Sequence, residues 1–259
     1  MRLFSDYHTH PQGHRVQPYT PALLQPWADA ARARGLRDIA FTDHDRYHEG
    51  VDFNEVERLR DNNPDLAVRA GIELDNDPVT GAAGRAWVER HWDRLDFVLG
   101  SVHYLEAERM FDSVGEEGQF AGRDIDAIYE DYFRRVREMA GSGLVDCLSH
   151  LDLIKIHGFR PHAPDVSLAQ ETLRFIKERG LAIELSTAGW RKTVGEQYPS
   201  RTLIGRAMEI GIPFTVASDA HSHVQQAENY DRLAALMAEC GITEVCVYER
   251  HRRRVVALD

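Results

Sequence analysis

The sequence has few cysteines and no long apolar run, and each shortage excludes a class of protein. Its three cysteines, scattered over 259 residues, are too few for the disulfide framework of a small secreted domain. No apolar run reaches the roughly 18 residues that a membrane-spanning helix needs, so no membrane association is expected. The first residues include neither a long apolar stretch nor a small-residue cleavage site, so we predict no secretory signal and expect a cytoplasmic protein.

Excess positive charge is also missing. The formal net charge is −11, which disfavours a nucleic-acid partner because binding of the phosphate backbone requires concentrated positive charge. The short basic run RHRRR at 250–254 is interpreted as a solvated turn or strand edge. A small anionic substrate remains compatible with the charge if bound metal ions supply cations locally. The sequence leaves the oligomeric state open, a homo-oligomer included.

What the chain does contain is a regular alternation of strand-like and helix-like segments. Strand-like runs occupy 3–8, 37–43, 66–74, 95–103, 144–150, 181–187 and 212–219, and a further run covers 243–249. Helix-like segments occupy 20–34, 54–62, 82–92, 124–141, 167–179, 200–210 and 231–240. Alternation of this kind predicts βαβ units and a parallel sheet. About seven or eight units in this length favour an α/β barrel, formed by residues 1–259 as one domain, over an open sheet.

Nearly every predicted strand ends in a side chain that can bind a metal ion. These strand-end residues are His8 and His10, Asp43, His44 and Asp45, Glu73 and Asp75, His103, His150 and Asp152, and Asp219 and His221. Because the C-terminal ends of parallel barrel strands meet on one rim, we expect these residues to lie together. Imidazole and carboxylate ligands without thiolate suit zinc, manganese or iron, and the set exceeds the needs of one ion. The sequence therefore predicts a site for two or three divalent metal ions.

Each signal also has a simpler interpretation when taken alone. The segment TDHD can be a helix cap followed by a polar loop, His103 and His150 can be buried core histidines, and His14 can be a loop residue. The joint pattern favours the metal site, because random placement would not put ligands at almost all strand ends and at almost none of the strand starts.

Several short motifs, in this order along the chain, resemble those of the PHP (polymerase and histidinol phosphatase) metallohydrolases: DYHTH, FTDHD, GIELD, GSVHYL, LSHLDL, STAG and ASDAH. HTHPQGH, HLDLIK and TAGWRK most resemble the monofunctional histidinol-phosphate phosphatases. The resemblance covers essentially the whole chain and implies a distorted (β/α)7 TIM-like barrel with three ions at its C-terminal rim. By position, one ion would be bound by His8, His10, Glu73 and Asp219, a second by Glu73, His103 and His150, and a third by His14, His44 and His221. The sequence departs from the family at Gln12, where a cysteine is common, and at Asp45, where small polar residues are common.

The reaction that the resemblance implies is hydrolysis of L-histidinol phosphate to L-histidinol and phosphate, in histidine biosynthesis. A metal-bridging hydroxide is expected to attack phosphorus in line with the departing alcohol. Since an alkoxide leaves poorly, a proton should be donated in the transition state, and Asp43 and Asp45 are the candidate donors. Asp219 is the candidate for orienting or deprotonating the water.

Cationic and loop residues near the strand ends are candidates for substrate binding. Arg191 follows the sixth predicted strand, and Arg160 and Lys155 follow the fifth; all three are expected to bind phosphate, or else to be surface charges. The loop 104–123 is long for a βα connection and follows His103. Phe111 and Asp112 in this loop are candidates to contact the imidazole and ammonium groups of histidinol, although a solvated lid explains the loop equally well.

Three other functions stay open. An amidohydrolase would need a bridging carbamylated lysine at the end of the fourth strand, where GSVHYL has none. Another PHP phosphoesterase could act on a different small phosphate ester, such as a mononucleotide. A non-catalytic metal-binding protein would carry the same ligands without turnover.

Overall fold

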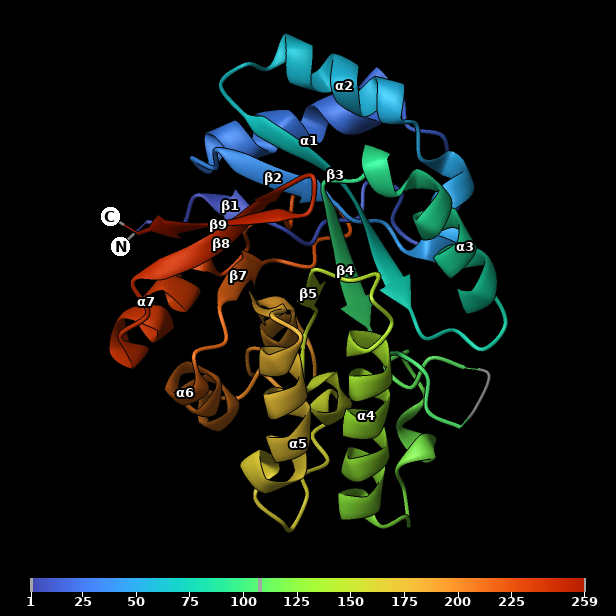
Figure 1. The fold of residues 1–259 in the computed structure, drawn as a ribbon, viewed down its shortest axis with the longest axis vertical. Coiled ribbons are helices and arrows are strands. Elements are labelled where there is room, and N and C mark those ends of the chain that lie inside the picture. The colour runs from blue at the N-terminus through green and yellow to red at the C-terminus, as the bar shows by residue number, and fades with distance from the viewer. Residues whose placement is uncertain (1, 107–108, 259) are drawn as a thin grey trace.

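The computed structural model describes residues 2–106 and 109–258, which form a nearly closed barrel of seven parallel strands surrounded by helices (Figure 1). The strands are β1 (Ser5–Asp6), β2 (Asp38–Phe41), β3 (Ala67–Asp75), β4 (Phe97–Ser101), β5 (Cys147–Leu148), β6 (Ala182–Ser186) and β7 (Phe214–Ala217). Each strand pairs in parallel with the next one along the chain. The predicted TIM-like barrel of parallel strands is therefore confirmed.

The barrel is closed between β7 and β1 by single backbone contacts rather than by a regular strand pair. The amide of Tyr7 donates to the carbonyl of Val216 at 3.1 Å, and the amide of His10 donates to the carbonyl of Ala220 at 2.8 Å. This seam places the segments that follow the first and the last barrel strand side by side. Residues separated by most of the chain thereby reach the same part of the rim.

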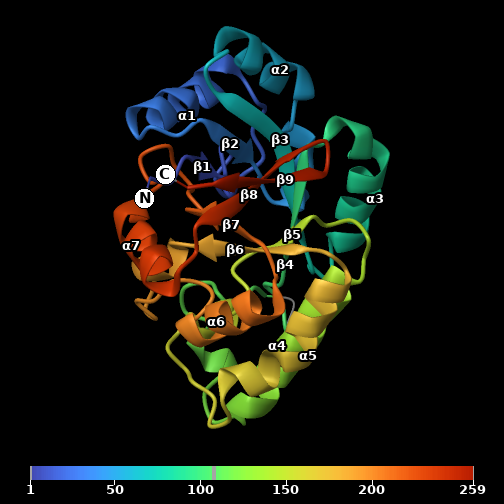
Figure 2. The same cartoon turned by 60° about the vertical axis from the view of Figure 1, so that its left-hand side comes forward.

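Seven α-helices cover the outside of the barrel in the described part of the chain (Figures 1 and 2). They are α1 (Pro21–Ala33), α2 (Phe53–Asn62), α3 (Gly81–His91), α4 (Ile125–Ala140), α5 (Asp165–Glu178), α6 (Arg201–Ile210) and α7 (Tyr230–Cys240). The side chains of Thr20 and Asp124 accept backbone amide hydrogen bonds at the starts of α1 and α4. Gly211 and Gly241 end α6 and α7 in the left-handed conformation, which glycine adopts without a steric penalty. No helix of the described residues is long and apolar enough to cross a membrane.

The eighth predicted strand is present but lies outside the barrel. It forms β8 (Glu244–Glu249), which pairs antiparallel with β9 (Arg252–Ala257). Cys246 and Tyr248 of this hairpin pack in one apolar cluster with Phe97, Cys147 and other residues near the strand starts. The hairpin therefore covers the N-terminal end of the barrel and leaves the C-terminal rim free. The basic run 250–254 contains the turn of the hairpin, as the sequence predicted, and also the first residues of β9, which the sequence did not predict as a strand.

Candidate metal centre

Imidazole and carboxylate side chains converge on Glu73, near the end of β3, at the C-terminal rim. Its Oε1 atom lies 3.3 Å from His8 Nε2 and 3.4 Å from His150 Nε2, and its Oε2 atom lies 2.7 Å from His44 Nδ1. His103 Nε2 lies 3.2 Å from His150 Nε2. The ends of β1, β2, β4 and β5 thus bring their histidines around one carboxylate.

Asp219 adds a second carboxylate from the segment after β7. Its Oδ1 atom lies 3.2 Å from His10 Nε2 and 3.7 Å from His8 Nε2. Its backbone has a φ of 51°, in the left-handed region that non-glycine residues rarely adopt. The seam between β1 and β7 brings this carboxylate to the histidines of the N-terminal segment.

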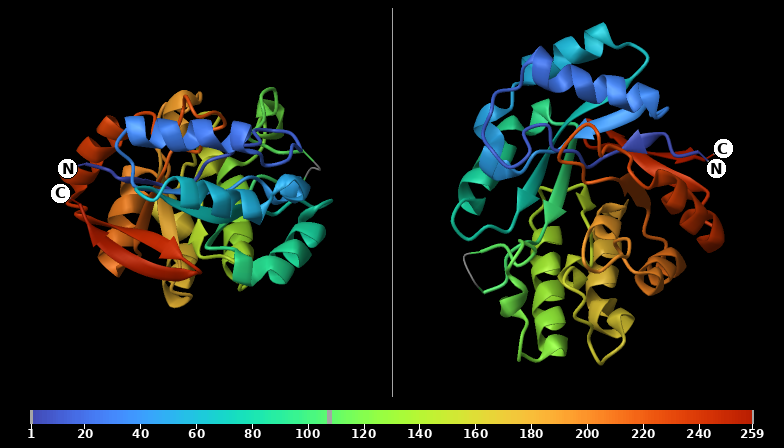
Figure 3. Two further views of the ribbon diagram at one scale, coloured as in Figure 1. Left: turned by 90° about the horizontal axis from the view of Figure 1, so that it is seen from above. Right: turned by 180° about the vertical axis from the view of Figure 1, so that it is seen from behind.

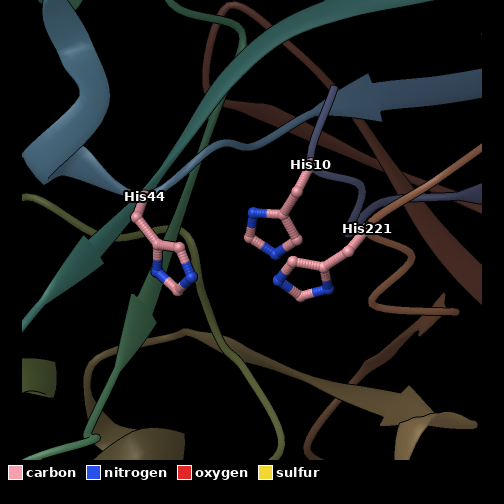
Figure 4. A group of neighbouring side chains, drawn as sticks. All are labelled: His10, His44 and His221. Atoms are coloured by element: carbon pink, nitrogen blue, oxygen red, sulfur yellow. The ribbon is translucent and has the colours of Figure 1, made fainter. Parts of the chain in front are cut away.

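A third group contains three imidazoles, those of His10, His44 and His221 (Figure 4). The ring centroids of His10 and His221 are 4.2 Å apart, and those of His10 and His44 are 4.7 Å apart. His14 stacks on His221 with 4.2 Å between ring centroids, and its ring lies 6.3 Å from that of His44. His14 therefore lies beside this group, as close to His221 as His10 is.

Several polar atoms of the centre are buried without a hydrogen-bond partner among the described residues. They are His8 Nε2, both ring nitrogens of His10, Glu73 Oε2 and His221 Nε2; the close contacts given above do not have hydrogen-bond geometry at these atoms. Buried polar atoms are normally satisfied, because an unpaired one costs free energy. Four groups bring three donor atoms each within 4.8 Å of one another: His8, Glu73 and His150; His8, His10 and Asp219; His10, His44 and His221; and His44, Asp75 and His103. This donor set, with imidazole and carboxylate and no thiolate, fits divalent zinc, manganese or iron.

Carboxylates behind the histidines hold the rings in place. Glu184 in β6 accepts at Oε2 from the ring of His8, with 3.0 Å to Nδ1, and at Oε1 from the backbone amide of His150 at 2.8 Å. Asp75 lies 2.9 Å from His103 Nδ1 on the far side of that ring. These contacts turn the Nε2 atoms of His8 and His103 toward Glu73, and such outer contacts commonly orient metal-ligating histidines.

The electrostatic environment keeps Glu73 and His10 in the form that binds metal. Burial raises the pKa of Glu73, but the neighbouring His44 and His8 outweigh it and hold that pKa well below the usual range. Burial and the neighbouring His221 hold the pKa of His10 well below its ordinary value. An ionised carboxylate and a neutral imidazole are the ligand forms that metals require.

Comparison with known proteins agrees with this arrangement. A family model described as the PHP domain matches residues 6–188. The chain belongs to the PHP family. A relative from Deinococcus radiodurans named "Probable histidinol-phosphatase" is 37% identical over 211 residues, which cover 75% of this chain and 78% of the relative. The "Histidinol-phosphatase" of Bacillus subtilis is 24% identical over 257 residues, covering 81% of this chain and 92% of the relative.

A solved structure shares the PHP fold over almost the whole chain. It is the histidinol phosphate phosphatase of Lactococcus lactis subsp. lactis Il1403, complexed with zinc, L-histidinol and phosphate. The TM-score is 0.76 at 19% identity, and the match covers 97% of this chain and 98% of that chain. At this identity the likeness supports the fold.

The two candidate proton donors of this PHP protein lie in different surroundings. Asp43 accepts hydrogen bonds from the amide of Gln12 at 3.0 Å and the hydroxyl of Tyr19 at 2.7 Å, and burial raises its pKa to about 7. It lies behind His10, with 4.0 Å between Oδ1 and the Nδ1 atom of that ring. Asp45 is also buried, in the short 3₁₀ helix η1 (Asp45–Gly50), and its carboxylate lies directly against Gly84 of α3.

The three predicted phosphate-binding cations are placed differently. Arg191 Nη2 donates to the backbone carbonyls of Ser218 and Asp219, at 2.7 Å and 2.9 Å, and its Nη1 lies 3.6 Å from Glu228 Oε2. Lys155 is buried and donates to Asp152 Oδ2 at 2.8 Å, and half-exposed Arg160 pairs with Glu196. All three cations thus have a carboxylate partner, and the contact of Arg191 with half-exposed Glu228 is the longest of the three.

The two loop candidates also differ in position. Phe111 is fully buried, packs edge-on against Phe120 and Tyr132, and donates its amide to the carbonyl of His103 at 2.9 Å. It anchors the loop to the barrel. The adjacent Asp112 has a buried Oδ1 without a partner in the described part of the chain. Burial lowers the pKa of His103, but Asp75, and after it Asp112, outweigh burial and raise that pKa. Residues 107 and 108 of this loop lie outside the described residues.

One charged residue of the centre was missed by sequence reasoning. Arg46 lies just after His44, and its Nη2 is 2.8 Å from Asp75 Oδ2 and 3.4 Å from His44 Nδ1. Its Nη1 donates to the hydroxyl of Tyr104 at 3.0 Å. The search for metal ligands at strand ends found Asp43, His44 and Asp45. The same search would have found Arg46 if it had included cationic side chains.

Proposed function

We propose that this PHP protein hydrolyses L-histidinol phosphate to L-histidinol and inorganic phosphate, with divalent metal ions bound at the rim. The observation that carries the proposal is the convergence of five histidines on Glu73, with buried ligand atoms that form no hydrogen bond within the described residues. The substrate is supported by the names of the relatives and by the histidinol and phosphate bound to the neighbour of the same fold.

We assign the ions to overlapping ligand sets. His8, His10, Glu73 and Asp219 would hold one ion, and Glu73, His103 and His150 a second. His44 and His221 would hold a third with His14, and the short contact between the rings of His10 and His221 makes His10 available to the same ion. When bound, zinc, manganese or iron ions would polarise phosphoryl oxygens and lower the pKa of water at the site.

The protein's own groups would bind and orient the substrate and move its protons. Arg191 is our first candidate for the phosphate, because its Nη1 atom forms no hydrogen bond within the described residues and its ion pair with half-exposed Glu228, 3.6 Å from Nη1 to Oε2, is longer than the pairs of the other two cations; Arg160 and Lys155 remain further candidates. Asp112 would attract the ammonium group of histidinol, and Phe111 would hold the loop that carries it. Asp219 would orient the attacking water, and Asp43 or Asp45 would supply the proton of the leaving alcohol.

The decisive experiment measures phosphate release from a panel of substrates by the protein loaded with zinc or manganese. Histidinol phosphate is expected to give a much larger kcat/KM than AMP or p-nitrophenyl phosphate. A larger kcat/KM for AMP would replace the assigned substrate by a nucleotide. Hydrolysis of an amide, or metal binding without turnover of any phosphate ester, would contradict a phosphatase.

We also propose a cytoplasmic location. All three cysteines are free thiols in the structure, and unpaired thiols suit a reducing compartment.

A further inference from the structure

The N-terminal face of the barrel, opposite the metal centre, gathers arginines in a chain whose net charge is −11. Two cavities of 490 Å³ and 300 Å³ lie on this face and share Arg69 and Arg254. The larger one is also lined by Arg250, Arg252 and Arg253, and the smaller one by Arg2 and Arg37. We call this surface the arginine face.

The fold creates the arginine face by laying the β8–β9 hairpin across the end of the barrel, next to both chain termini (Figure 3). Arg252 and Arg254 are two residues apart on β9, so they project from the same side of that strand. The hairpin turn is held firmly, because the His251 ring stacks on Trp92 at 3.6 Å and its Nδ1 lies 2.8 Å from Asp146 Oδ2. The arginines are therefore presented from an ordered scaffold.

The positive charge of this face is only partly neutralised. Seven arginines line the two cavities, against the carboxylates of Asp38 and Glu249. Both carboxylates are near Arg69, at 3.1 Å and 3.5 Å. Arg252 and Arg254 are exposed and form no ion pair with any residue that the structure describes. Uncompensated guanidinium groups at close range repel one another unless an anion lies between them.

We propose that the arginine face binds a small linear oligophosphate, either inorganic triphosphate or the phosphate chain of a nucleoside triphosphate. A guanidinium group binds phosphate oxygens through two parallel hydrogen bonds, so several arginines around adjoining cavities match several linked phosphates. The cavity volumes lie near the range usual for small-ligand sites. An extended nucleic acid would instead run over the acidic remainder of the surface, which repels it.

The test measures binding of triphosphate, and separately of ATP, to the metal-loaded protein by calorimetry, with saturating inorganic phosphate present to compete at the metal centre. The variant Arg252→Gln/Arg254→Gln removes two charges from the face. Its matched control, Arg174→Gln/Arg201→Gln, removes two exposed arginines from α5 and α6. Any metal chelation by the ligand affects all three proteins alike, and phosphatase activity reports whether each protein is folded.

We expect the Kd for triphosphate to rise about tenfold or more in Arg252→Gln/Arg254→Gln and to stay unchanged in the control. In the parent protein, the Kd should rise with salt concentration. Equal affinity for ATP and triphosphate would assign recognition to the phosphate chain, and tighter ATP binding would add a contact to the nucleoside; both support the site. Equal affinity in all three proteins would overturn it. Tighter binding of a single-stranded oligonucleotide than of either small ligand would also overturn it.

Discussion

His8 and Glu184 lie 3.0 Å apart, from Nδ1 to Oε2, and both side chains are completely buried. Burial lowers the pKa of His8, but the negative charges of Glu184 and Glu73 outweigh it and hold that pKa well above its ordinary value. The contact fixes the ring so that Nε2 faces Glu73. Glu184 is therefore a positioning residue for the proposed centre.

Replacement of Glu184 by Gln should weaken metal binding by about 10- to 100-fold, because the ring of His8 loses its charged partner. Competition with a metal-sensing chelator measures this affinity directly, and excess metal should restore part of the activity. Glu178→Gln, at the exposed end of α5, is the matched control. An unchanged metal affinity in Glu184→Gln would show that His8 does not need this partner.

Glu73→Gln should reduce both bound metal and kcat, each by at least about 100-fold, because Glu73 is the carboxylate shared by the proposed ligand sets. Elemental analysis of the purified variant and phosphate release from histidinol phosphate provide the two measurements. Full metal content together with full activity would refute the assigned ligands.

Arg191→Gln should raise KM for histidinol phosphate and Ki for inorganic phosphate by about tenfold or more, since a phosphate-binding fork is lost. Arg191 also holds the carbonyls of Ser218 and Asp219, so metal content must be measured alongside. Normal metal content with weaker phosphate binding supports direct contact, whereas loss of metal would show that Arg191 acts through Asp219. Arg160→Gln, which removes a cation already paired with Glu196, should have the smaller effect.

The hairpin turn should make stability depend on pH through His251. Burial lowers the pKa of His251, but Asp146 outweighs it and raises that pKa above 6.5 in the folded protein. The protonated ring therefore stabilises the fold fully below the pKa of the unfolded chain, and this contribution is lost as pH rises through the folded pKa. The difference in urea midpoint between the parent and His251→Gln should be larger at about pH 5.5 than at about pH 9. A difference that grows with pH would contradict the pairing.

Two helical glycines should respond oppositely to alanine. A Cβ at Gly84 in α3 would lie 1.8 Å from Asp45 Oδ2, so Gly84→Ala should destabilise the protein by about 1–3 kcal/mol through overpacking. Gly205 in α6 has open space, so Gly205→Ala should stabilise by about 0.5–1 kcal/mol. Denaturant unfolding measures both, and a stabilised Gly84→Ala variant would mean that Asp45 moves freely.

The sequence predicted the barrel because alternating segments and a ligand at each strand end are local patterns. The strand predicted at 3–8 was too long, because only Ser5–Asp6 form β1. The residues after β1 make single backbone contacts with the segment around β7 and do not continue the strand pair. The eighth run, 243–249, was recognised as a strand, but its antiparallel partner β9 was not, because a run of arginines lacks the usual apolar signal.

The candidate site was likewise predicted only in part. The strand ends indicated His8, Glu73 and His150, whose positions follow from the barrel geometry. The sequence could not rank Arg191 above Lys155, because only the folded protein shows that Lys155 forms a short, buried ion pair with Asp152 while the contact of Arg191 with Glu228 is longer and partly exposed. Lys155 and Asp152 are only three residues apart, but the burial of their pair depends on tertiary contacts.

The seam between β1 and β7 has a consequence for how the protein matures. His8 and Asp219 are separated by most of the chain, and neither can meet the other before the ribosome has delivered both. An ion bound by both would join the first and last barrel strands where regular strand pairing is lacking. Metal supply during synthesis would then decide how much of the newly made chain closes its barrel, so starvation for the ion should reduce folded protein as well as activity.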